Sequence, residues 1–260
     1  MNRTELARWL WAEHQANNQF VPFAPANGIA TLQEAYDAQE AYVDVMQSAG
    51  LGAVSGWKIG LTSARMQEMC GIDQPAAGAV LAARMLPSGA NLSLATYGRL
   101  GLEFEIAVRL GRDLPPGDTP PTLADVVAAV DGVAAGVELV DDRRADYAQL
   151  DVLSLIADNS WNAGVLLGDF VPPSADLEDC KGVISLNGAE IDRGSGRDVL
   201  GGPMQVLHWL ASHLSRRGRG LRAGDVVMTG SIIATQFPEP GARYLYALEG
   251  VGSLSLSITQ

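Results

Sequence analysis

The sequence predicts an α+β fold, with a helical segment over residues 1–50 and a larger domain over residues 51–260. Three observations support this prediction. Apolar residues recur at helical spacing up to Gly50, the period changes to that of short strands from residue 54, and few helical stretches interrupt those strands. Many short strands with few helices are typical of a fold built on a mixed, curled sheet.

Composition limits the classes of partner. The chain has 260 residues, of which 47% are hydrophobic, so it can bury a substantial core. Its formal net charge of −12 argues against nucleic acid or an anionic membrane as a partner. Cys70 and Cys180 are far apart, which predicts a reducing cytoplasm and not a disulfide framework. No signal peptide and no run of about 18 apolar residues is visible, so we expect a cytoplasmic protein that does not span a membrane.

The N-terminal segment contains two predicted helices. Residues 4–16 have helical apolar spacing, and we expect His14 to lie on the surface of that helix. Thr31 and Glu34 form a capping box, in which each side chain accepts a hydrogen bond from the backbone at the other position. This box predicts the start of a second helix, which we expect to end at Gly50.

Short apolar or alternating stretches predict the strands of the larger domain. These strands cover residues 54–62, 101–110, 134–140, 165–168, 183–191, 244–250 and 254–258, and the stretch 221–231 predicts a turn, a buried strand and a loop of small residues. The stretch 183–191 contains Asn187-Gly188 and predicts a hairpin, whereas 194–197 has the composition of a mobile loop. Helices are predicted over residues 63–70, 122–130 and 203–215, and on the last we expect His208 and His213 to have structural or surface roles.

The stretch Gly101-Leu102-Glu103-Phe104-Glu105 carries the most informative pattern. Alternate side chains of a strand share a face, so Glu103 and Glu105 lie side by side and their charges repel. Glu138 is a further isolated acid in an apolar run. Buried charges need partners, and a hard cation with oxygen ligands supplies one. These three glutamates therefore predict a site for Mg²⁺ or Mn²⁺; the alternative is a solvated strand face.

Lys58 is the second candidate for chemistry. It lies on an apolar strand between Gly56 and Gly60, and these glycines allow a ligand to approach the backbone. Lys58 is either a desolvated amine that moves protons or holds a carboxylate, or an edge residue whose ammonium group reaches water. Other small polar residues lie in loops at strand ends, where turns favour such residues anyway: Asp73, Asp158, Asn159, Ser160, Thr229 and Ser231. No phosphate-binding glycine loop and no serine-hydrolase elbow is present.

Six motifs occur in an order that resembles one enzyme family. They are GWKIGLT at 56–62, IDQP at 72–75, EFEIA at 103–107, VELV at 137–140, IADN at 156–159 and AGDVVMTG at 223–230. Their order resembles that of the 2-keto-4-pentenoate hydratase and 4-oxalocrotonate decarboxylase family, within the fumarylacetoacetate hydrolase superfamily. The resemblance covers nearly the whole chain. It implies a fumarylacetoacetase-like mixed β-roll, with the N-terminal helices before a catalytic domain over residues 51–260.

The resemblance also implies roles for individual residues. Glu103, Glu105 and Glu138 match the metal-binding carboxylates of the family, which usually hold Mg²⁺ or Mn²⁺.

Lys58 matches the active-site lysine of the family. Asp158 and Ser160 fall in the motif that lines the substrate pocket, so the resemblance implies that they act in catalysis, for example by positioning water. Asp73 and Thr229 are implied to bind substrate.

The activity implied by the resemblance is the addition of water to a 2-hydroxy-2,4-dienoate, which gives a 4-hydroxy-2-oxo acid in bacterial degradation of aromatic compounds. Family members are homo-oligomers, and some associate with a partner decarboxylase. Alternatives are a 4-oxalocrotonate-type decarboxylase, an acylpyruvate hydrolase and a non-catalytic partner subunit. Two positions depart from the family pattern: Ala76 follows Pro75 where many hydratases have aspartate, and Trp161 replaces a shorter residue and would narrow the pocket.

Overall fold

The α+β class predicted from the sequence is confirmed by the computed structural model, which describes residues 1–173 and 176–260. Its α-helices are α1 (Arg3–Gln15), α2 (Leu32–Met46), α3 (Ala64–Cys70), α4 (Leu123–Val127), α5 (Val152–Ala157) and α6 (Pro203–Arg216). No helix in these two ranges is both long enough and apolar enough to cross a membrane.

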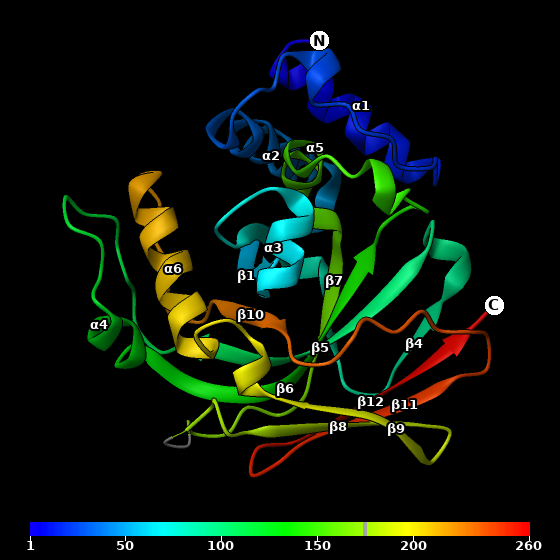
Figure 1. Ribbon diagram of the computed structural model, residues 1–260, viewed down its shortest axis with the longest axis vertical. Coiled ribbons are helices and arrows are strands. Elements are labelled where there is room, and N and C mark those ends of the chain that lie inside the picture. Colours follow the sequence, from blue (N-terminus) through cyan, green and yellow to red (C-terminus); the bar gives the residue numbers. More distant parts are fainter. Residues whose placement is uncertain (174–175) are drawn as a thin grey trace.

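The described strands form two sheets, and both are mixed, as predicted (Figure 1). The first has the order β2-β1-β10-β5-β6-β7-β3, with β1 Val54–Gly60, β2 Ala76–Leu81, β3 Met85–Pro87, β5 Leu100–Leu110, β6 Val130–Asp141, β7 Asn162–Leu167 and β10 Val226–Ser231. The second has the order β4-β12-β11-β8-β9, with β4 Ala90–Ser93, β8 Lys181–Leu186, β9 Ala189–Ser195, β11 Arg243–Leu248 and β12 Gly252–Thr259.

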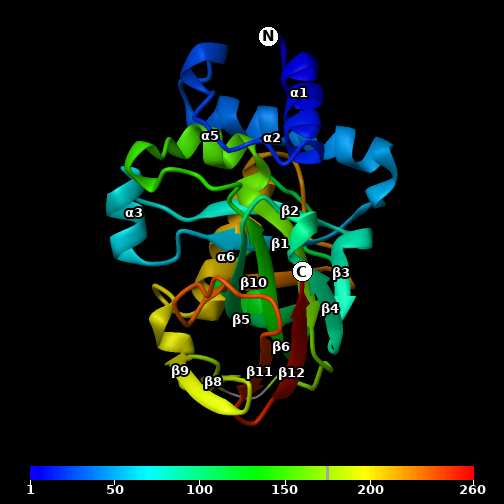
Figure 2. The same ribbon diagram turned by 90° about the vertical axis from the view of Figure 1, so that its right-hand side faces the viewer.

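Helices α1, α2 and α5 form a layer at one end of the molecule, and β8, β9, β11 and β12 lie at the other end (Figure 2). Asn2 and Thr31 begin α1 and α2 with capping boxes, as predicted for Thr31. Gly50, with φ 95°, lies in the π-helical turn Gln47–Leu51 that ends the second helical stretch. The buried residues of α1 and α2 belong to the same hydrophobic core as those of both sheets, and the domain boundary at residue 50 stays a prediction.

Strand β5 lies at the centre of the fold, and its two faces have different surroundings. The ring of Phe104 packs against Tyr244 and Tyr246 of the second sheet, with centroids 5.9 Å and 5.4 Å away. Because side chains alternate along a strand, the residues on either side of Phe104 point away from this aromatic contact. Packing of Phe104 against the second sheet therefore turns Glu103 and Glu105 towards the opposite side of β5.

Two local expectations need correction, and one helix was not expected. The helix predicted over 122–130 ends at Val127, because Val130 already begins β6, where it pairs with Leu110 of β5. The stretch 194–197 is not a free loop: a Cβ at Gly194 would lie 1.8 Å from the carbonyl oxygen of Ile232, so this glycine permits close packing. The short helix α5 was not predicted. The Asn187-Gly188 hairpin turn is confirmed, with φ of 53° and 87°.

Candidate active site

Glu103, Glu105 and Glu138 meet at one point on the first sheet. Glu103 lies directly opposite Glu138 in the antiparallel pair of β5 and β6, and Glu105 lies two residues further along the same face. One carboxylate oxygen from each residue lies within 4.8 Å of the other two. Glu105 and Glu138 are fully buried, and Glu103 is partly buried. The predicted cluster of three acids is therefore present.

The hydrogen bonds of this cluster leave carboxylate oxygens free. Each carboxylate accepts a hydrogen bond from a separate residue: Glu103 from Thr235 Oγ1 (3.0 Å), Glu105 from the Gly230 amide (2.7 Å) and Glu138 from Asn162 Nδ2 (2.9 Å). Oε1 of Glu105 and Oε2 of Glu138 are buried and have no hydrogen-bond partner among the described residues. Buried polar atoms are normally satisfied, and Mg²⁺, Mn²⁺ and Ca²⁺ take oxygen ligands. The donor set therefore fits a hard divalent cation.

The acid–base properties of the cluster lead to the same conclusion. Burial raises the pKa of Glu105 well above its ordinary value, and the charges of Glu138 and Glu103 raise it further. Burial also raises the pKa of Glu138 to about 7, although Lys58 opposes this increase. Without a cation, the cluster therefore holds protons near neutral pH, because adjacent buried carboxylates cannot all ionise.

Lys58 lies beside these acids. Its Nζ is 3.3 Å from Oε1 of Glu138, and its side chain is buried. Burial lowers the pKa of Lys58, but the charges of Glu138, Glu103 and Glu105 outweigh burial, and the net shift is upward. Lys58 is therefore an ammonium ion, which can hold an anionic group of a ligand.

The glycines near Lys58 allow close packing around its side chain and its strand. A Cβ at Gly60 would lie 2.9 Å from Nζ of Lys58, and a Cβ at Gly78 would lie 3.1 Å from its Cγ. A Cβ at Gly56 would lie 2.3 Å from the carbonyl oxygen of Val226 on the neighbouring strand. Gly60 and Gly78 make room for the lysine side chain, Gly56 allows close strand packing, and Gly60 also lines the cavity described below.

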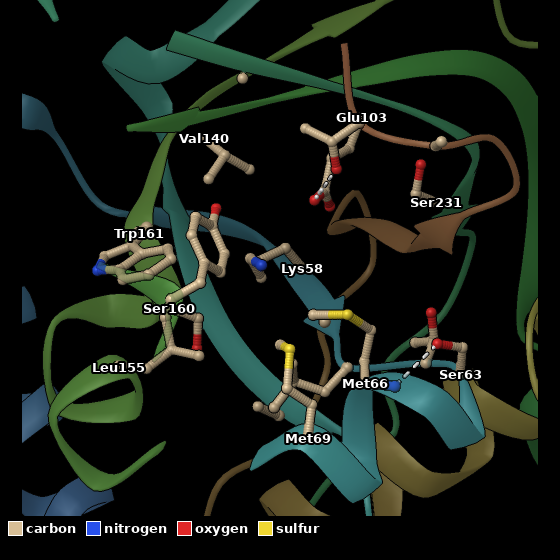
Figure 3. A pocket seen from close by; sticks show the side chains of 18 of the residues that line it. Lys58, Ser63, Met66, Met69, Glu103, Val140, Leu155, Ser160, Trp161 and Ser231 are labelled. Carbon is tan, nitrogen blue, oxygen red and sulfur yellow. Dashed lines mark hydrogen bonds between the residues drawn. The ribbon is translucent and has the colours of Figure 1, made fainter. Parts of the chain in front are cut away.

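A cavity of about 850 Å³ opens next to Lys58 and Glu103 (Figure 3). Ser160 and Ser231 add hydroxyl groups to its wall. Ser160 is buried, and its hydroxyl donates to the carbonyl of Ala77 at 3.3 Å. Trp161, which the sequence predicted to narrow the pocket, also lines the cavity. The remainder of the lining is mainly apolar.

Asp158 does not line this cavity. Its carboxylate is buried. Oδ1 lies 2.6 Å from Nε2 of His14, and Oδ2 accepts a hydrogen bond from Nη2 of Arg143 at 2.6 Å. These bonds lie at a separate cavity of about 400 Å³. The structure therefore gives no support to Asp158 as the residue that positions water. The prediction that His14 is a surface residue is wrong, because its side chain is only 18% exposed and is paired with Asp158.

Asp73 and Thr229 also lie outside the cavity lining. Asp73 is exposed in a bend. Thr229 is fully buried, and its hydroxyl donates to the carbonyl of Ile106 at 2.8 Å, so its side chain holds β10 to β5. The segment after Thr229 does reach the site, because residues 231–235 line the cavity. Sequence reasoning located this loop but selected a neighbouring residue.

Two residues that contact the carboxylates were missed. Asn162 is a polar residue at the start of an apolar strand, a signal that could have marked it. Thr235 follows an apolar stretch without any distinguishing pattern, and it reaches Glu103 only because the chain returns alongside β5.

A left-handed turn separates the two cavities. Asn159, Ser160 and Trp161 have φ of 51°, 50° and 58°, a conformation that residues with side chains rarely adopt. The amide group of Asn159 exchanges two hydrogen bonds with the backbone of Ala79, at 2.7 Å and 2.9 Å. This turn directs Ser160 and Trp161 into the larger cavity, while Asp158 just before it stays in the smaller one.

Comparisons with known proteins agree with this geometry. The family model for the fumarylacetoacetate (FAA) hydrolase C-terminal region matches residues 63–259. A 2-keto-4-pentenoate hydratase of Burkholderia vietnamiensis is 34% identical, over 90% of this chain and 87% of the relative. A 2-keto-4-pentenoate hydratase of Paraburkholderia phymatum is 33% identical, over 100% of this chain and 98% of the relative.

Among solved structures, 4-oxalocrotonate decarboxylase from Pseudomonas putida G7, complexed with magnesium and adipate, superposes with a TM-score of 0.90. It is 27% identical, and the match covers 98% of this chain and 97% of that one. The resemblance drawn from the sequence motifs is thus confirmed. The chain belongs to the fumarylacetoacetate hydrolase family, and within it to the group of 2-keto-4-pentenoate hydratases and 4-oxalocrotonate decarboxylases.

Proposed function

We propose that this protein is a divalent-metal-dependent hydratase, which adds water to a 2-hydroxy-2,4-dienoate and forms a 4-hydroxy-2-oxo acid during degradation of aromatic compounds. The observation that carries the proposal is the cluster of Glu103, Glu105 and Glu138 beside Lys58 at the wall of a large cavity. Relatives named as hydratases that align over 90% or more of the chain support this choice of reaction.

The metal in this proposal is Mg²⁺ or Mn²⁺, held by Glu103, Glu105 and Glu138. The two buried carboxylate oxygens without partners support it, because oxygen ligands suit both ions. When bound, such a cation supplies Lewis-acid stabilisation of the negative charge that develops on the oxygen at carbon 2 of the substrate.

Lys58 has the role of holding the substrate carboxylate. Its buried ammonium group faces the same cavity as Glu103. Binding there orients the substrate while its enol proton leaves and carbon 5 takes up a proton. The resulting 2-oxo-3-enoic acid is electrophilic at carbon 4. The water oxygen bonds to carbon 4, carbon 3 takes up a proton, and the product is the 4-hydroxy-2-oxo acid.

Ser160 takes the place of Asp158 as the residue that positions water in this scheme. Its hydroxyl lines the cavity and donates to Ala77, so its lone pairs remain free to accept a hydrogen bond from water. We expect Ser160→Ala to lower kcat with little change in KM, measured by steady-state hydration kinetics. An unchanged kcat would contradict this role.

The proposal includes a cytoplasmic location and a homo-oligomer, with a decarboxylase of the same family as a further partner. Support comes from the two free cysteines and from the full-length similarity to bacterial metabolic enzymes. Size-exclusion chromatography with light scattering would measure the oligomeric state, and a monomer would contradict this part.

The decisive experiment follows the ultraviolet absorbance of freshly prepared 2-hydroxypenta-2,4-dienoate with metal-free protein, and then with Mg²⁺ or Mn²⁺. We expect metal-dependent loss of the conjugated band and formation of 4-hydroxy-2-oxopentanoate. Glu105→Gln is expected to lose this activity and most metal affinity. Full activity after complete metal removal, or a Glu105→Gln variant with unchanged metal affinity, would overturn the proposal.

Decarboxylation of 4-oxalocrotonate is the second candidate reaction. The superposition on a 4-oxalocrotonate decarboxylase at a TM-score of 0.90 favours it, and the same carboxylates would serve both reactions. Release of carbon dioxide from 2-oxo-3-hexenedioate, without hydration of the pentadienoate, would select this reaction.

A further inference from the structure

We infer that the cavity selects 2-hydroxydienoates whose far end carries an uncharged apolar group, and that it rejects those with a second carboxylate at that end. This selectivity rests on the proposed function, because it names the substrate class of the same site. It is carried by the residues at the end of the cavity away from the carboxylates.

The far end of the cavity is apolar. Met66 and Met69 of α3 lie across the cavity from Glu103, with Lys58 between them (Figure 3). Leu155 lies on the same side of the cavity as the two methionines (Figure 3). The volume of about 850 Å³ lies in the range of about 300–1,000 Å³ that is typical of sites for drug-sized ligands. A five-carbon acid held at Lys58 would leave much of this apolar space unfilled.

Arg99 is a cation of the lining, but it is already neutralised. Its Nε lies 2.8 Å and 3.0 Å from the two carboxylate oxygens of Asp142, and its Nη2 lies 2.5 Å from one of them. Asp142 is buried, and the guanidinium group lies over the rings of Tyr147 and Phe237, 5.8 Å and 5.1 Å from their centroids. This bidentate pair occupies the Nε–Nη2 edge of Arg99 and neutralises its charge.

The remaining charges also disfavour an anion at the far end. Lys58, the other cation of the described lining, is already paired with Glu138 in the carboxylate cluster. Glu103 and Asp198 add negative charge to the wall. A second carboxylate would therefore lose its hydration without gaining a free cation, which is strongly unfavourable. An alkyl or aryl group at the same position would gain affinity, by about fourfold for each buried methylene.

Binding of saturated 2-oxo acids tests this selectivity without turnover. Isothermal titration calorimetry on the Mg²⁺-loaded protein compares 2-oxopentanoate, 2-oxooctanoate and 2-oxohexanedioate. We expect 2-oxooctanoate to bind at least tenfold more tightly than 2-oxopentanoate, and 2-oxohexanedioate to bind at least tenfold more weakly. Equal affinities of the two monocarboxylates, or tighter binding of the dicarboxylate, would overturn the inference.

Turnover of the matching dienoates separates this inference from the proposed function. Hydration of 2-hydroxypenta-2,4-dienoate, with no gain in kcat/KM from a 5-alkyl substituent, would refute the selectivity and keep the hydratase. Apolar selectivity in calorimetry without hydration of any dienoate would refute the hydratase and keep the selectivity of the cavity.

Two variants of one residue provide a matched comparison. Met66→Lys places a cation in the apolar end. We expect this variant to shift the ratio of the affinities for 2-oxohexanedioate and 2-oxooctanoate by at least tenfold in favour of the dicarboxylate. Met66→Leu keeps the apolar wall and should leave the ratio within about twofold. An unchanged ratio in Met66→Lys would contradict the inference. Met69→Lys repeats the test from the next turn of α3, in case the first variant does not fold.

Discussion

The ammonium group of Lys58 occupies space that is free only because residue 60 is glycine. A Cβ on Gly60 would lie 2.9 Å from Nζ of Lys58, which itself lies 3.3 Å from Glu138. The backbone of Gly60 is not left-handed, so alanine can adopt its conformation, and the flexible end of Lys58 has to move instead. Residue 60 therefore controls the position of the amine without touching the carboxylates.

We expect Gly60→Ala to lower kcat/KM for dienoate hydration by about 100-fold, because a displacement of about 1 Å in an active site has an effect of that size. The melting temperature should fall by only a few degrees. Steady-state kinetics and differential scanning calorimetry measure the two effects. Gly117→Ala is the control, at an exposed glycine where a Cβ would make only an ordinary contact, 3.6 Å from the carbonyl oxygen of Thr119. Full activity of Gly60→Ala would show that hydration does not depend on the present position of the Lys58 amine.

At the scale of elements, the left-handed turn Asn159–Trp161 connects the network of Asp158 with the active cavity. Asp158 is paired with His14 and Arg143 in front of this turn. The charges of His14 and Arg143 lower the pKa of Asp158, although burial opposes them. Because three consecutive residues are held in an unfavourable conformation, these ion pairs act as an anchor for the turn.

Asp158→Asn is expected to lower the free energy of unfolding by about 3 kcal/mol, because it leaves the charge of Arg143 buried without its partner. We also expect lower kcat/KM through displacement of Ser160 and Trp161, with metal affinity within about twofold of the native value. Chemical denaturation, kinetics and metal titration measure these quantities. Asp118→Asn, at an exposed loop position, is the control. A strong loss of metal affinity would assign Asp158 to the metal site.

Helix α6 contains a buried histidine that predicts a pH effect on stability. His213 packs against Tyr36 of α2 and against Trp209, with ring centroids 4.3 Å and 5.2 Å away. Burial lowers the pKa of His213 to about 4 from 6.5, and Arg217 and Arg216 add to this effect. Below pH 6.5 the unfolded chain therefore binds a proton that the folded chain does not.

This difference should remove about 3 kcal/mol of stability as the pH falls from 6.5 to 4. His213→Gln cannot take up the proton, so its free energy of unfolding should depend less on pH in this window. Urea denaturation of both proteins at several pH values measures the difference in slope. Identical slopes would show that His213 titrates normally in the folded protein.

For the molecule as a whole, the buried acids couple metal loading to folding. The pKa of Glu138 is about 7 in the folded protein, compared with 4.5 ordinarily, so the folded state binds more protons between these values. The free energy of unfolding of the metal-free protein should therefore fall by about 3 kcal/mol from this group as the pH rises from 4.5 to 7.

Metal-free native protein should consequently melt below metal-free Glu105→Gln at pH 8, because this variant removes one buried like charge and leaves Glu138 paired with Lys58, and the difference should vanish near pH 4.5. Mg²⁺ should raise the melting temperature of the native chain at pH 8 and leave that of the variant nearly unchanged. Calorimetry with chelator-treated protein makes this comparison. A native protein that is more stable than the variant at pH 8 without metal would contradict the expected repulsion.

Much of this architecture could be predicted from the sequence because its signals are local. Alternation within one strand placed Glu103 and Glu105 together, and a capping box marked the start of α2. The division into two sheets could not be predicted, since it depends on pairing between distant segments. For the same reason Thr235 was missed. Asp158 was assigned to the substrate cavity but lies at the smaller one, because the sequence does not indicate towards which cavity a polar loop residue points.

All three carboxylates lie on the neighbouring strands β5 and β6, whereas α3, the segment after β10 and the turn after α5 form the cavity wall. Evolution can therefore change the cavity wall and the metal-binding strands separately. After gene duplication, one copy can change residues of the cavity wall and acquire a new substrate specificity, while strands β5 and β6 with their carboxylates stay unchanged. Among descendants of this chain, substitutions should accumulate slowly on β5 and β6 and quickly at positions such as Met66 and Phe237.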